Sequence, residues 1–319
     1  MSTMLDQLLT DGALFVDNST LEAYNNCPRQ FLYRSIYKRV TASPQSALTF
    51  GGAIHKALEF RYRNDKNLSS PATTECGMID EFGRCLSERP IAEDDYRNYD
   101  YGCGLIRKYN AMYGLEPFSI ATAPVGELMV ELPFAIALGL VHNPRTDVAI
   151  PVIYTGRLDL GIYDDIDGTF WVMDHKTNSI VGDSFYAQQA MSAQQEGYNY
   201  ACWRTMGKRP EGFVINMLAT RKETKSGKGI EFNRQRVYLS EERLVEWEKN
   251  TLILIQEMIT YVATETLPMR KAHCVSKYGR CQYYDVCSLP QNQRATLLES
   301  NLFTTNTWSP LHAPSQPAE

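Results

Sequence analysis

No apolar run in this sequence is long enough to cross a lipid bilayer, which takes about 20 consecutive residues that are mostly apolar. Residues 1–11 include acidic side chains and lack the basic-then-apolar order of a secretory signal. These absences argue against a membrane-bound or secreted protein. They predict a cytoplasmic chain that has no membrane partner.

An excess of positive charge is absent as well. The 319 residues include 32 Lys and Arg against 37 Asp and Glu, which gives a formal net charge of -5. This balance argues against a protein that coats nucleic acid through its overall charge. It leaves room for an enzyme that holds DNA in a local basic groove, because carboxylates gathered around metal ions lower the net charge.

The pattern of apolar residues predicts a mixed α/β fold. Large apolar residues fall on every second position over 128–140, which indicates a strand. A hairpin turn at 164–168 should join the next two strands. The further strands are expected at 152–163, 169–177, 213–218 and 236–239.

Helices are expected on either side of these strands. Ser19 followed by Glu22 fits a capping box, and Ser240 is a good N-cap for a long amphipathic helix. The helices should begin near Ser19 and Gly51 and cover 92–113, 184–205 and 241–264, with a variable excursion at 64–92. We expect one domain over 1–302 with its core at about 49–265, then a disordered polar tail at 303–319.

Two acidic residues and a lysine fall within the central strands. Alternate residues of a strand share a face, so Asp174 and Lys176 point to the same side, and the hairpin brings Asp159 close to them. Mg²⁺ prefers carboxylate oxygens, and a metal held there could polarise a phosphoryl oxygen and activate water near Lys176. The pattern predicts a centre for phosphodiester hydrolysis, although Asp-x-Lys alone is common as a surface ion pair.

Five short motifs follow one another over 19–287. They are Ser19-x-Leu-x-x-Tyr24-x-x-Cys27-Pro28, Gly51-Gly-x-x-His55, Gly156-Arg-x-Asp159, Asp174-x-Lys176 and Gln194-x-x-x-Tyr198. In this order they resemble the RecB-like branch of the PD-(D/E)XK nucleases, which includes the AddB nuclease domain and CRISPR-associated exonucleases. The resemblance implies a restriction-endonuclease-like core, in which helices flank a mixed central sheet.

The resemblance also implies roles for single residues. His55 and the backbone carbonyl of His175 would join the metal site, with Mg²⁺ or Mn²⁺ as cofactor, and an imidazole ligand suits Mn²⁺. Glu131 lies on the polar side of its strand and could add a carboxylate, but it is not among the implied ligands. His55 and the Gln194–Tyr198 pair could equally be packed residues. The implied catalytic set is Asp159, Asp174, Lys176, Gln194 and Tyr198, of which Asp159 and Asp174 also bind the metal.

Eight cysteines in a cytoplasmic chain are not expected to form disulfides. Three of them, Cys274, Cys281 and Cys287, lie close together near the C-terminus, and with Cys27 they resemble the iron–sulfur staple of AddB-type and CRISPR-associated nucleases. The resemblance implies a [4Fe-4S] cluster that ties 19–40 to 266–302, with Zn²⁺ or unliganded thiols as alternatives. Six residues separate Cys274 from Cys281, a longer spacing than is usual in AddB. The scattered thiols, interpreted as packed or partly exposed, are Cys76, Cys85, Cys103 and Cys202.

Basic residues gather in the segment 220–236. This segment is a candidate phosphate-contacting loop, and a solvated hairpin is equally compatible with it. Gly227-Lys228 lacks the glycine spacing of a P-loop, so no ATP site is expected. The candidate DNA contacts are Arg221, Lys222, Lys225 and Lys228, and the segment also contains Arg234 and Arg236.

The sequence thus predicts a metal-dependent DNA nuclease, by analogy an exonuclease that acts on single strands or DNA ends. Recombination, repair and phage DNA processing are compatible pathways, with recombination or replication proteins as partners. The first alternative is a non-catalytic DNA-binding or scaffold subunit with the same fold and a structural cluster. The presence of Asp159, Asp174 and Lys176 argues against it. A second alternative is an enzyme of this fold that acts on RNA or on a displaced strand.

Overall fold

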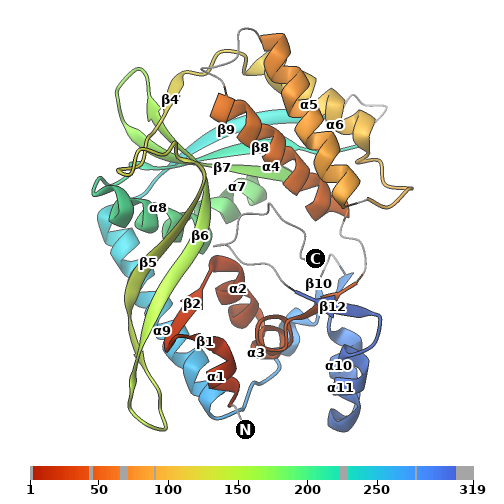
Figure 1. Cartoon of the computed structure of the whole chain (residues 1–319), viewed down its shortest axis with the longest axis vertical. Helices are drawn as coiled ribbons and strands as arrows, with labels where there is room; N and C mark the ends of the chain where they lie inside the picture. The colour runs from red at the N-terminus through yellow and green to blue at the C-terminus, as the bar shows by residue number, and fades with distance from the viewer. Residues whose placement is uncertain are drawn as a thin grey trace. The chain divides into compact units, whose positions relative to one another are not determined.

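The computed structural model describes residues 3–42, 46–64, 71–89, 91–222, 229–276 and 279–306. The chain forms two compact units (Figure 1). The first comprises Met1–Ser43, Pro133–Gly156 and Val245–Glu319, and the second comprises Pro44–Leu132 and Arg157–Leu244. The expected extent of one nuclease domain, 1–302, stays a prediction.

A mixed sheet forms the centre of the second unit. Its middle strands, β7 (Phe170–Asn178) and β8 (Gly212–Ala219), are parallel. β7 also pairs antiparallel with the end of β6 (Ala149–Asp164), and β8 pairs antiparallel with β9 (Glu231–Tyr238). β4 (Phe118–Ile120) runs antiparallel to β6.

Helices cover both faces of this sheet. α4 (Ser46–Asn64), α5 (Pro71–Glu88) and α6 (Tyr99–Met112) pack together, and their apolar residues form one core with Trp171 and Met173 of β7. α8 (Ala193–Met206) follows α7 (Asp183–Ala190) and contacts β7 and β8. Gln194 of α8 accepts a hydrogen bond from Lys176 of β7. Lys176 lies three residues beyond Met173 on that strand, so the two side chains point to opposite faces of the sheet. The predicted fold class, a mixed sheet flanked by helices, is confirmed.

The first unit joins segments from both ends of the sequence. β1 (Leu9–Thr10) pairs with β2 (Ala13–Val16), which runs parallel to the beginning of β6. β3 (Arg39–Thr41) pairs antiparallel with β12 (Phe303–Thr305). The remaining elements are α1 (Met4–Leu8), α2 (Asn18–Asn26), α3 (Pro28–Phe31), the π-helix Leu32–Ile36, most of α9 (Glu241–Ala263), the 3-10 turn Lys271–His273, β10 (Val275–Ser276), β11 (Gly279–Arg280), α10 (Tyr284–Ser288), α11 (Gln291–Leu298) and part of β5 (Val130–His142).

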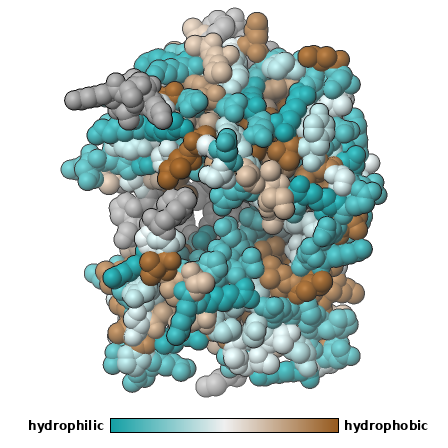
Figure 2. Space-filling view, turned by 180° about the vertical axis from the view of Figure 1, so that it is seen from behind, coloured by the Kyte–Doolittle hydropathy of each residue, from teal (hydrophilic) through white to brown (hydrophobic). Residues whose placement is uncertain are grey.

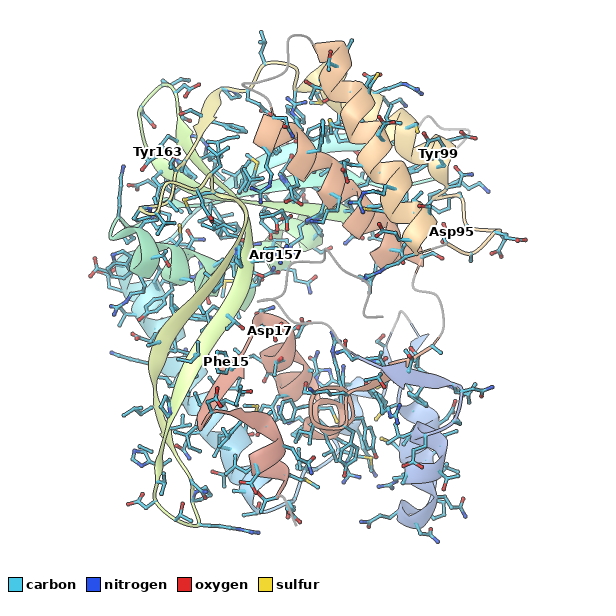
Figure 3. The ribbon with its side chains drawn as sticks, in the orientation of Figure 1. Phe15, Asp17, Asp95, Tyr99, Arg157 and Tyr163 are labelled. Carbon is cyan, nitrogen blue, oxygen red and sulfur yellow. The ribbon has the colours of Figure 1, made fainter. Side chains whose placement is uncertain are left out.

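Several expected elements differ from the observed ones. The capping box at Ser19 is wrong: Asp17, labelled in Figure 3, caps α2 by accepting the N–H of Thr20 at 2.9 Å. The excursion at 64–92 is also wrong, because α5 forms there and buries Met78 and Phe82, one turn apart, in the core. The helix expected over 184–205 is interrupted between α7 and α8.

The expected tail begins too early, because Phe303–Thr305 is held in a strand through pairing with β3. Residues 307–319 lie outside the described ranges. The N-cap role of Ser240 is confirmed, since its hydroxyl accepts the N–H of Arg243 at 3.3 Å.

No helix in the described ranges is both long and apolar enough to span a membrane. Figure 2 shows hydrophilic residues over most of the visible face, with apolar residues in separate patches.

Candidate active site

The candidate acidic residues and the lysine come from adjacent strands of the second unit. Asp159 lies on β6, and Asp174 and Lys176 lie on β7. The labels of Arg157 and Tyr163 in Figure 3 mark the stretch of β6 that carries Asp159. Its neighbours Leu158 and Leu160 are 3% and 0% exposed, as the alternation predicts for side chains that face the core.

Lys176 is held between a strand and a helix. Its Nζ lies 2.7 Å from Asp174 Oδ2 and donates to Gln194 Oε1 of α8 at 3.0 Å. The Asp174 side chain is only 2% exposed, so the ammonium compensates a carboxylate that has lost most of its water. The structure therefore brings together Asp174, Lys176 and Gln194, with Tyr198 one turn further along α8.

His55 of α4 brings a third element to the site. Its Nδ1 lies 3.5 Å from Asp159 Oδ2 and 3.7 Å from Glu131 Oε1. One candidate ligand atom from each of these three residues lies within 4.8 Å of the other two, a spacing that suits a metal ion. The predicted ligands His55 and Asp159 are thus neighbours, and Glu131 joins them.

Glu131 was a possible additional carboxylate from the sequence but was not among the predicted ligands, and it lies beside them. It lies at the start of β5 with a backbone φ of 46°, a left-handed conformation that residues other than glycine rarely adopt. Such strain is found most often at functional sites. The alternation over 128–140 placed Glu131 on the polar side of its strand, but a period of two could not show that it would meet His55.

The charges of the site act on one another strongly. Burial alone would lower the pKa of His55, but Asp159 and then Glu131 outweigh it and raise the pKa to about 9. Burial raises the pKa of Asp159 to about 7; His55 opposes this rise, and Asp174 and Glu131 add to it. Without a metal, a protonated His55 therefore balances the crowded carboxylates.

The residue between Asp174 and Lys176 contacts the site through its backbone. The N–H of His175 donates to Asp159 Oδ2 at 2.8 Å, which links β7 to β6 at the carboxylates. The His175 ring points to the opposite face and is 3% exposed. A role for its carbonyl in metal binding stays a prediction.

The four cysteines of the expected staple line one pocket in the first unit. Arg270 and His273 also line it, and the N–H of Arg270 lies 3.4 Å from Cys27 Sγ. Burial raises the pKa of the Cys281 and Cys287 thiols. None of the eight cysteines, all of which lie in the described ranges, forms a disulfide.

The candidate DNA contacts are only partly described. Arg221 lies 3.5 Å from Glu231 in an ion pair, and Lys222 is exposed. Lys225 and Lys228 lie outside the described residues. Arg234 and Arg236 of the same segment lie on β9 and pair with Glu116 and Asp164.

A family model described as the PD-(D/E)XK nuclease superfamily matches residues 18–288, which include every predicted site residue. The chain belongs to the PD-(D/E)XK nuclease superfamily. The predicted nuclease, a phosphodiester hydrolase, is thereby confirmed. This superfamily uses divalent metals, and the trio of His55, Glu131 and Asp159 could hold one.

Two solved structures are similar to this PD-(D/E)XK chain. A Eubacterium rectale protein provisionally named an exonuclease is 11% identical, with a TM-score of 0.49 over 88% of this chain and 92% of its own. LHK-Exo in complex with dAMP is 10% identical, with a TM-score of 0.24 over 68% of this chain and 95% of its own. No curated protein sequence matches the chain significantly.

Proposed function

We propose that this nuclease is a Mg²⁺- or Mn²⁺-dependent deoxyribonuclease. One observation carries the proposal: the candidate metal trio of His55, Glu131 and Asp159 lies beside the ion pair of Asp174 and Lys176. His55 and Asp159 lie 3.5 Å apart, and the backbone N–H of His175 joins Asp159 to the strand that carries Asp174 and Lys176. Superfamily membership supports this assignment of the site.

The site residues have different roles in phosphodiester hydrolysis. His55, Glu131, Asp159, Asp174 and the carbonyl of His175 would hold the metal. When bound there, the metal would supply Lewis-acid chemistry for phosphodiester hydrolysis, polarising a phosphoryl oxygen and neutralising developing charge. Lys176, fixed by Asp174 and Gln194, offers a preorganised positive charge to the attacking water and to the phosphate.

Single-stranded DNA or DNA ends are the proposed substrate, and recombination, repair or phage DNA processing is the proposed context. These details rest on the resemblance of the ordered motifs to the RecB-like branch. The preference for DNA over RNA rests on the same resemblance and is part of the test below.

We also propose that the cysteine pocket holds a [4Fe-4S] cluster. All four cysteines line it, so the donor set fits. The resemblance of these cysteines to the iron–sulfur staple of AddB-type and CRISPR-associated nucleases favours a cluster over a single Zn²⁺ ion.

The test is degradation of end-labelled single- and double-stranded DNA by anaerobically purified protein with Mn²⁺ or Mg²⁺, with an RNA competitor. Asp174→Ala and Lys176→Ala should retain the fold and colour and lose cleavage by at least about 100-fold, as expected when a preorganised charge is removed. Asp165→Asn, which changes an exposed carboxylate in the β6–β7 turn, should cut like the wild type.

Equal activity in all four proteins would refute the active site. No cleavage in any of them would favour the alternative of a DNA-binding subunit with a structural cluster.

A further inference from the structure

A row of polar side chains crosses three strands on the apolar face of the second unit's sheet. His175 of β7 pairs in register with Asn216 of β8, and Asn216 pairs with Arg234 of β9. Asn216 is fully buried, in a strand whose eight residues are all buried. Its neighbours on that face, Val214 and Leu218, belong to the hydrophobic core. A buried amide is costly unless its hydrogen bonds are made, so the partners of Asn216 are informative.

The partners fix the orientation of the Asn216 amide. The guanidinium of Arg234 can only donate, and its Nε lies 3.1 Å from Asn216 Oδ1. The other end, Nδ2, therefore faces His175 Nδ1 at 2.8 Å and donates to the hydroxyl oxygen of Tyr109 at 2.9 Å. Because Nδ2 is a donor, His175 Nδ1 must accept, and the ring proton lies on Nε2.

Arg234 is itself held in place. Its Nη1 donates to Glu116 Oε2 at 2.5 Å, and its Nη2 donates to Glu116 Oε1 at 2.9 Å. The hydroxyl of Tyr62 donates to the same carboxylate at 3.0 Å, and Arg61 pairs with it at 3.3 Å. The arginine thus cannot turn without breaking a buried, two-point ion pair.

The opposite end of the row reaches the active centre. The His175 ring stacks on Tyr62 at 5.7 Å and meets His55 edge-on at 5.8 Å, and both residues belong to α4. Its backbone N–H donates to Asp159 Oδ2 at 2.8 Å. Fixing the ring therefore fixes the peptide that contacts the Asp159 carboxylate and that would present a carbonyl to the metal.

We propose that Asn216, oriented by Arg234 and Glu116, is a positioning residue for the metal centre, which it serves by holding His175 as its Nε2–H tautomer. The inference rests on the proposed function, because the centre it serves is the metal site of His55 and Asp159.

The decisive variant is Asn216→Asp. An aspartate of nearly equal shape still accepts from Arg234, and it can accept from the Tyr109 hydroxyl, which in the wild type accepts from Nδ2. It cannot donate to His175 Nδ1. The ring proton should then move to Nδ1, and the peptide at Asp159 should be less well positioned. Loss of an outer hydrogen bond to a metal site typically costs 10–100-fold in metal affinity, and we expect a loss in that range.

The measurement combines two readouts that do not depend on activity. Long-range ¹H–¹⁵N spectra of the histidine-labelled protein report the tautomer, and only five histidines need to be distinguished. Calorimetry reports Mn²⁺ affinity. Wild type should show Nε2–H at His175, and Asn216→Asp should show Nδ1–H together with weaker Mn²⁺ binding. Arg234→Lys, which keeps a positive charge beside Glu116 but removes the Nε–H, should weaken binding in the same direction.

Asp164→Asn is the matched control, because it removes a buried carboxylate of β6 that pairs with Arg236 of β9, away from the metal trio. It should lower stability and leave Mn²⁺ affinity unchanged. A wild-type Nδ1–H tautomer, or unchanged Mn²⁺ affinity in an Asn216→Asp protein whose tautomer has switched, would overturn the inference. If the wild type binds no Mn²⁺ at all, the proposed function fails instead. If Asn216→Asp does not fold, the tautomer of His175 in the wild type and the Mn²⁺ affinity of Arg234→Lys still test the inference.

Discussion

His55 is the residue whose protonation couples most directly to the metal site. It lies within 3.7 Å of two carboxylates, and 28% of its side chain remains exposed. Its pKa of about 9 in the metal-free protein means that the ring is protonated at neutral pH. An imidazolium cannot bind a cation, so metal binding must displace this proton.

We therefore expect Mn²⁺ affinity to rise with pH up to about 9 instead of levelling off near 6.5. Below that pKa, one displaced proton lowers affinity by up to about tenfold per pH unit. Calorimetry at pH 7.5 in buffers of different ionisation enthalpy should show about one proton released per ion. His142→Gln, a change at an exposed histidine, should keep this release, and His55→Asn should abolish it. Release that persists without His55 would contradict the prediction.

The same shift affects stability without metal. The folded-state pKa of His55 is raised above its usual value of 6.5, so its stabilising contribution is fully present below pH 6.5 and is lost as the pH rises through 9.

At this scale the sequence predicted the identities of Asp159, Asp174 and Lys176 from strand alternation. It missed Asn216, although a single polar residue within the apolar run 213–219 was a usable signal.

α4 shows how an element sets the distance between parts of the site. Gly51 and His55 are one turn apart on this helix, and a Cβ on Gly51 would lie 2.7 Å from the hydroxyl of Thr177 on β7. A Cβ on Gly52 would meet nothing within 4 Å. The two adjacent glycines of the motif therefore have different roles, and only Gly51 lets α4 approach the strand next to Lys176.

Gly51→Ala should push α4 away from β7, which costs about 1–3 kcal/mol as overpacking does and weakens Mn²⁺ binding through His55. Gly52→Ala should be neutral or stabilise by up to about 1 kcal/mol, since alanine favours helix. Urea unfolding and Mn²⁺ calorimetry measure both effects. Adding Thr177→Ala to Gly51→Ala should restore much of the loss, and failure of this rescue would show that the Thr177 contact is not the cause.

At the scale of the whole chain, the first unit joins distant parts of the sequence through protein contacts. Arg29 Nε donates to the carbonyl of Leu267 at 2.9 Å, and the Tyr283 hydroxyl donates to the carbonyl of Arg39 at 2.5 Å. Tyr24, from the first motif, donates to Glu257 at 2.8 Å. Tyr283 also lines the cysteine pocket, so a cluster would add to a junction that the protein already makes.

We expect anaerobically purified protein to contain about four iron atoms and four sulfides per chain, and Cys281→Ser to lose most of them. Because cluster binding is coupled to folding, the melting temperature of Cys281→Ser should fall below that of the wild type. Residues 270–290 of the variant should also become more sensitive to protease. Cys76→Ser, a change at an exposed thiol outside the pocket, should keep the iron. About one zinc per chain instead of iron would contradict the cluster and favour the zinc alternative.

Local periodicity let the sequence determine the strands β5 to β8 and the shared face of Asp174 and Lys176. The direction of neighbouring side chains depends only on the backbone of one strand. The ordered motifs identified the nuclease superfamily in the same way, since each motif is a short local pattern.

Only the tertiary structure decided which faces meet. Glu131 reaches His55 from 76 positions away in the sequence, and Arg234 finds Glu116 from 118 positions away. α5 formed in a polar stretch because Met78 and Phe82 find a shared core. Such contacts depend on packing between elements, and a periodic pattern states which side of an element is buried without stating what covers it.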